Sequence, residues 1–75
     1  MEYIKVSVKD LEDDEVDKKV FINGQENGVV GNVLIVDKGI LEINVEGMKL
    51  PQAFEIKNTT QTNPRKIELD LSFGE

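Results

Sequence analysis

The sequence predicts a small all-β protein, a two-layer antiparallel β-sandwich of about six strands with no long helix. Turn-forming pairs such as Asn23-Gly24 and Lys38-Gly39 separate short apolar runs, and both residue types tolerate the positive φ that tight reversals need. Apolar and polar residues alternate over 41–46, as in a strand with one solvated face. Strands this short bury their apolar faces against a second sheet, and 75 residues make one domain, 1–75.

The first two strands are expected at 3–8 and 18–22. Apolar residues alternate with polar ones in the first, and the second ends at the Asn23-Gly24 turn. Between them, residues 10–17 hold six acidic side chains, which is too much charge for a strand interior. This segment is therefore expected to be a loop or one short helical turn.

The middle of the chain predicts a hairpin. A strand is expected at 29–36, with a bulge or a close backbone approach at Gly31, and the four consecutive apolar residues 33–36 indicate a central strand. A turn at 37–39 is expected to lead into a strand at 40–46 that pairs with 33–36. The pair Asn27-Gly28 is read as a further reversal of the chain.

The last two strands are expected at 53–57 and 65–73. Pro51 cannot donate to a sheet ladder, so 48–52 is a connection, and 58–64 is a polar loop. The inward-facing positions of all six strands predict the core. Its expected members are Ile4, Val6, Val20, Ile22, Leu34, Val36, Leu41, Ile43, Val45, Phe54, Ile56, Ile67, Leu69 and Leu71.

The composition of the chain limits the classes of partner and the kinds of site that we expect. Nine basic against fifteen acidic residues give a net charge of −6, which opposes contact with nucleic acid or anionic lipid. Neither a disulfide nor a thiolate metal site is available without cysteine. The given sequence shows no signal peptide and no membrane-spanning run, so we expect a cytoplasmic protein. If the chain is a fragment of a longer protein, an exported or cell-surface location is expected instead. We expect a protein partner or neighbouring domains, and a monomer or weak dimer.

Residues 20–71 resemble a PEGA-type domain, a small bacterial and archaeal β-sandwich module of exported and surface proteins. VFINGQENG is similar to the opening hairpin of that family, KGILEINVEG to its central signature, and RKIELDL to its last strand. The Thr-Pro usual before the second strand is replaced by Val30-Gly31, and the name-giving Pro-Glu-Gly-Ala is absent. The resemblance implies a non-catalytic interaction or spacer module and lends no catalytic residues.

The residue types argue against an enzyme. The chain has no His or Cys, and its two serines, Ser7 and Ser72, fall on expected strands without a neutral base nearby. A hydrolase would require a concave pocket that shifts carboxylate pKa values. No cofactor is expected.

The acidic segment is the best candidate for a metal site, because Ca²⁺ takes six to eight oxygen ligands. Its spacing lacks the central Gly and distal Glu of an EF-hand loop, so a solvated loop is expected and any Ca²⁺ binding would be weak. The candidate ligands are Asp10, Asp13, Asp14, Glu15 and Asp17.

Two functions remain open. The first is a non-enzymatic interaction or spacer module that binds through an edge strand, because unpaired backbone groups at an edge accept a partner strand. Strands 3–8 and 65–73 are terminal in sequence, so either could lie at an edge and dock a partner or a second copy, which makes Ser7 and Ser72 the partner-binding candidates. The second is an acidic inhibitor or nucleic-acid mimic whose residues 10–17 occupy a basic site, which requires carboxylates from several segments on one face.

Overall fold

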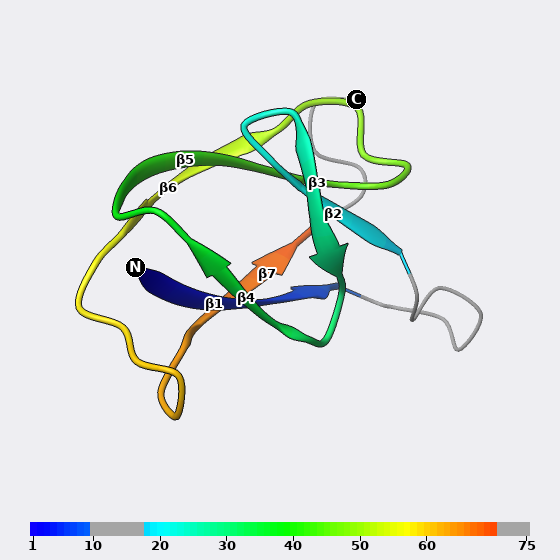
Figure 1. Cartoon of the computed structure of the whole chain (residues 1–75). Helices are drawn as coiled ribbons and strands as arrows, with labels where there is room; N and C mark the ends of the chain where they lie inside the picture. Colours follow the sequence, from blue (N-terminus) through cyan, green and yellow to red (C-terminus); the bar gives the residue numbers. More distant parts are fainter. Residues whose placement is uncertain (10–17, 71–75) are drawn as a thin grey trace.

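A computed structural model of the chain describes residues 1–9 and 18–70, and within these residues it is all-β, with seven strands and no helix (Figure 1). The described residues also contain no helix long and apolar enough to cross a membrane. The strands are β1 (Glu2–Val8), β2 (Lys19–Ile22), β3 (Gln25–Val29), β4 (Val33–Val36), β5 (Gly39–Val45), β6 (Gln52–Ile56) and β7 (Arg65–Leu69).

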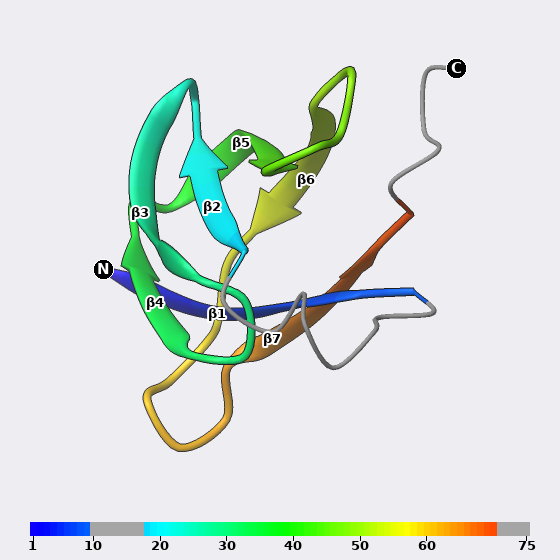
Figure 2. The ribbon, with the colours of Figure 1, turned by 90° about the vertical axis from the view of Figure 1, so that its right-hand side faces the viewer.

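The strands form two sheets that face each other as layers. A three-stranded sheet has the order β4-β1-β7, and a four-stranded sheet has the order β3-β2-β5-β6 (Figure 2). All pairs are antiparallel except β1 with β7, which run parallel. The expected sandwich is confirmed, with a parallel pair that the sequence did not indicate.

The core lies between the two sheets and follows the predicted alternation. Twelve of the fourteen expected residues are buried, Phe54 is half-buried against the core, and Leu71 lies outside the described residues. Ile4, Val20 and Ile43 have no exposed surface. The core also includes three residues that were not expected: Val8, Val30 and Met48.

The predicted turn at Asn23-Gly24 is confirmed. Asn23 and Gly24 have φ angles of 51° and 84°, which is the pair of positive values that a two-residue hairpin loop needs. Asn23 also joins the hairpin to β5, since its N–H donates to the carbonyl oxygen of Glu42 at 2.8 Å and its Oδ1 accepts from the N–H of Glu42 at 2.9 Å.

The predicted hairpin between 33–36 and 40–46 is wrong. β4 and β5 belong to different sheets, because the chain crosses between layers at 37–38. The single strand expected at 29–36 is also two strands, divided at 30–32, where the Gly31 N–H donates to the carbonyl oxygen of Val6 at 2.9 Å. β4 is thus an edge strand, not a central one, and Asn27-Gly28 continues β3 instead of reversing the chain.

Thr59 fastens the loop between β6 and β7 to the start of β1. Its hydroxyl accepts from the N–H of Tyr3 at 2.6 Å and donates to Oε1 of Glu2 at 2.7 Å, and its own N–H donates to the same carboxylate oxygen at 2.8 Å. The hydrogen bond from the Thr59 hydroxyl has the largest effect on the pKa of Glu2 and lowers it from its ordinary value. The hydrogen bond from the Thr59 N–H lowers it further, and desolvation raises it by a smaller amount.

We expect Thr59→Val to raise the pKa of Glu2 toward its ordinary value, measured by NMR titration of the carboxyl carbon. A lowered folded-state pKa stabilises the fold above the unfolded-state pKa, and this contribution disappears as the pH falls through the folded-state value. The melting temperature of the variant should therefore lie below that of the wild type at neutral pH, and the gap should narrow in acid. Thr62→Val, in the same loop, is the control, and a gap that does not narrow in acid would contradict this account.

Candidate functional site: the groove between two sheet edges

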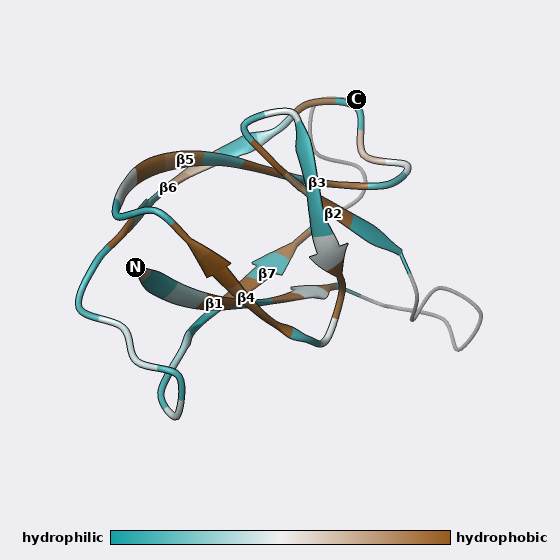
Figure 3. Ribbon diagram, in the orientation of Figure 1, coloured by the Kyte–Doolittle hydropathy of each residue, from teal (hydrophilic) through white to brown (hydrophobic). Residues whose placement is uncertain are grey.

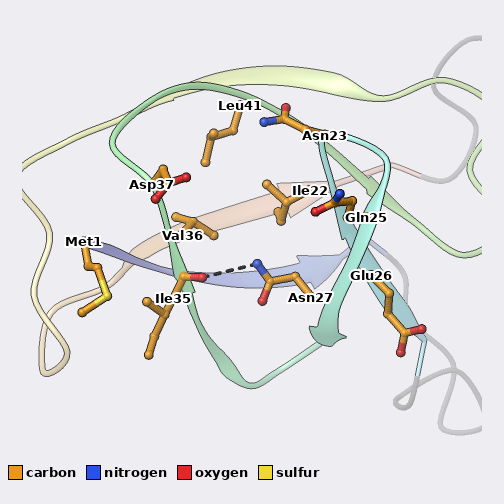
Figure 4. Close-up of a pocket in the computed structure, with 10 residues that line it drawn as sticks. All are labelled: Met1, Ile22, Asn23, Gln25, Glu26, Asn27, Ile35, Val36, Asp37 and Leu41. Carbon is orange, nitrogen blue, oxygen red and sulfur yellow. Dashed lines mark hydrogen bonds between the residues drawn. The ribbon is translucent and has the colours of Figure 1, made fainter.

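The candidate site is a groove between the outer edges of β3 and β4, hereafter the β3–β4 groove, with a cavity of about 230 Å³. Three core side chains, Ile22, Val36 and Leu41, point into it (Figure 4). Polar residues of β3, exposed for the most part, stand along one side, and Met1 and Ile35 lie at the other. The groove therefore has an apolar floor formed by core side chains and a polar rim.

The geometry of Ile35 shows which backbone groups face the groove. Its carbonyl oxygen accepts a hydrogen bond from Nδ2 of Asn27 at 3.3 Å, so this carbonyl points toward β3 and away from β1 (Figure 4). In a strand, the N–H and C=O of one residue point to the same side and alternate along the chain. The backbone groups of Val33 and Ile35 thus face outward, while those of Leu34 and Val36 face β1.

The side chains of β4 are all apolar, which is unusual for a strand at the edge of a sheet. Val33 and Ile35 are 43% and 53% exposed, and Leu34 and Val36 are buried in the core. β4 is brown along its length in Figure 3, whereas the neighbouring β3 is largely teal. Edge strands in natural proteins are commonly protected by charge, proline or a bulge, and β4 has no charged residue.

The other three edges each carry such protection. β7 exposes the charged side chains of Lys66 and Glu68. On β6, the carbonyl oxygen of Glu55 is covered by the guanidinium of Arg65, which also lies 5.8 Å from the centroid of the Phe54 ring.

The edge of β3 is protected by a salt bridge and by a distortion of the strand. The carboxylate of Glu26 lies 4.0 Å from the ammonium of Lys19, and the register of β3 with β2 shifts between Lys19 and Phe21. Gly28 of β3 has a φ of 127°. β4 has one comparable contact, the hydrogen bond from Nδ2 of Asn27 to the carbonyl oxygen of Ile35, but it has no charged residue, proline or bulge.

The partner-binding residues expected from the sequence are not at this groove. Strand β1, a candidate for an edge from its terminal position, is central, because β4 and β7 pair with it on either side. Ser7 is exposed on the outer face of the three-stranded sheet, and its hydroxyl donates to the carbonyl oxygen of Ile67 at 3.4 Å. Position in the sequence misleads here, since the chain returns to pair β7 with β1.

The closing strand, the other candidate for an edge, does lie at one, but Ser72 lies outside the described residues. The same holds for the candidate calcium ligands Asp10, Asp13, Asp14, Glu15 and Asp17. Among residues 1–9 and 18–70, no three His, Cys, Asp or Glu side chains gather where they would hold a metal ion.

The sequence carries one signal for the groove, the apolar run at 33–36. Four consecutive apolar residues at 33–36 are typical of a strand covered on both sides, and the structure leaves one side of that strand open. No family model, curated protein or solved structure matches the chain.

Proposed function

We propose that this chain is a non-enzymatic protein-interaction module that binds an extended segment of a partner protein along β4. The observation that carries the proposal is an edge strand of four apolar residues beside a cavity with an apolar floor and a polar rim. A partner strand would pair with the outward backbone groups of Val33 and Ile35, which is the common mode of strand addition at a sheet edge. The resemblance to PEGA-type modules supports the same class of function.

The cavity sets the kind of side chain that the partner would present. A volume of about 230 Å³ is enough for one aliphatic or aromatic side chain, since an apolar protein cavity of about 150 Å³ takes up benzene. Fully burying such a side chain contributes roughly 1.5 to 3 kcal/mol. The partner segment is therefore an extended peptide with alternating side chains, one of them apolar and facing Ile22, Val36 and Leu41.

Ile35→Lys is expected to weaken this binding strongly. Random peptides displayed on phage would be selected on the wild-type chain, and their affinities for the variants measured by fluorescence anisotropy. A charged side chain at the rim both guards the edge and removes apolar surface, so we expect a loss of about 100-fold, or ~2.7 kcal/mol. Ile40→Lys is the matched control, because Ile40 is 73% exposed and projects from the face of β5 opposite to Leu41, which lines the groove.

Selected peptides should share an alternating apolar pattern and shift the amide resonances of Val33 and Ile35. Peptides that bind the Ile35→Lys chain as tightly as the wild type, or a selection that yields no binder, would overturn the proposal.

A further inference from the structure

A second cavity lies on the outer face of the four-stranded sheet and is not used by the proposed function. It has a volume of about 400 Å³ and is lined by Phe21, Gly24, Glu42, Asn44 and Pro51. Phe21 of β2 stands directly opposite Asn44 of β5 in the register of the two strands. Glu42 is two residues before Asn44, so both side chains project from the same face of β5.

Asn44 carries an amide oxygen that is buried and accepts no hydrogen bond. A buried acceptor without a donor destabilises a fold, and such groups are rare in native proteins. The oxygen is sealed from solvent, so a ligand reaches it only when the amide turns toward the cavity, and this turn breaks no hydrogen bond because the oxygen makes none. Asn44 is thus poised to accept from a ligand with N–H groups.

The carboxylate of Glu42 and the ring of Phe21, which also line the cavity, favour a positively charged ligand. The backbone of Glu42 is fixed by its two hydrogen bonds to Asn23, while its exposed carboxylate makes no ion pair with any described residue. The half-buried ring of Phe21 offers an aromatic surface, against which cations bind. Lys19, which projects from the same face of β2 as Phe21, is engaged with Glu26 at 4.0 Å.

We propose that this cavity binds the guanidinium group of an arginine side chain in a peptide or protein partner. The planar group stacks on Phe21, donates to the carboxylate of Glu42, and uses a further N–H for the amide oxygen of Asn44. Arginine fits better than lysine, because its flat, weakly hydrated group stacks on aromatic rings and carries five donors in a fixed geometry. The net charge of −6 attracts such a ligand over longer distances.

The test is an NMR titration of the full ¹⁵N-labelled chain with N-acetyl-arginine-N-methylamide. We expect saturable shifts at Phe21, Glu42 and Asn44, with a dissociation constant on the order of millimolar for so small a ligand. The citrulline counterpart, which is neutral and nearly the same shape, should leave these resonances unchanged. The lysine counterpart should bind more weakly than the arginine compound.

Two variants separate recognition from a structural role. Glu42→Gln is expected to weaken binding by roughly tenfold, because it removes a charge-assisted hydrogen bond, whereas Glu55→Gln, on the same outer face but outside the cavity, should bind as the wild type does. Asn44→Leu should lose arginine binding without lowering the melting temperature, since it removes an unpaired buried oxygen. Equal shifts with citrulline, full binding by the Glu42→Gln chain, or no saturable shift would each overturn the proposal.

Discussion

Ile43→Ala is expected to lower the free energy of unfolding by about 3 to 4 kcal/mol. Ile43 has no exposed surface and lies on β5, which is flanked by β2 and β6 in the four-stranded sheet. Removing three carbon atoms there leaves a cavity that the surrounding β strands cannot close. A chain of this length has roughly 4 to 11 kcal/mol in total, so much of the stability would be lost.

The matched control is Ile40→Ala, the same substitution three residues earlier on the same strand. Ile40 is 73% exposed and points away from the core, so its loss should be below about 1 kcal/mol. Urea denaturation followed by circular dichroism measures both values. Similar losses for the two variants would show that β5 does not have one buried and one solvated face.

Gly28→Ala is expected to destabilise the fold by about 2 to 4 kcal/mol, for two separable reasons. The φ of Gly28 is 127°, which a residue with a Cβ atom rarely adopts. A Cβ atom there would also lie 2.6 Å from Cδ2 of Leu34, a buried side chain of β4. The two strands that border the β3–β4 groove are therefore in contact through this glycine.

Comparison with Gly39→Ala separates the steric clash from the backbone strain. Gly39 has nearly the same φ, 128°, but a Cβ atom there would meet nothing within 4 Å. Both variants carry the backbone strain, so the difference between their free energies of unfolding, about 1 to 3 kcal/mol, measures the clash with Leu34. Equal losses would mean that Leu34 does not pack against β3 at Gly28.

Alternation in the sequence predicted which residues are buried, because the period of two places every second side chain on the same face. Leu41, Ile43 and Val45 are all in the core, as expected. The same pattern does not state which strands are neighbours, and a short turn-like segment at 37–38 serves equally well for a hairpin or for a crossing between sheets. That ambiguity explains the wrong pairing of β4 with β5.

The candidate site was harder to predict for a related reason. An apolar run such as 33–36 indicates that both faces of a strand are buried. It does not indicate whether the residues that bury them belong to the same chain or to a partner. The prediction of Ser7 rests on the position of its strand near the N-terminus, and this position does not determine sheet order, because β7 returns to pair with β1. Asn44 gave no signal at all, since an unpaired amide is visible only in three dimensions.

Amide hydrogen exchange along β4 tests the central claim, that this strand is an open edge that accepts a partner. In the chain alone, the amides of Val33 and Ile35 should exchange quickly, and those of Leu34 and Val36 slowly, because the latter face β1. A selected peptide should then slow exchange at Val33 and Ile35. Equal protection at all four amides in the chain alone, or no slowing when peptide binds, would contradict the account.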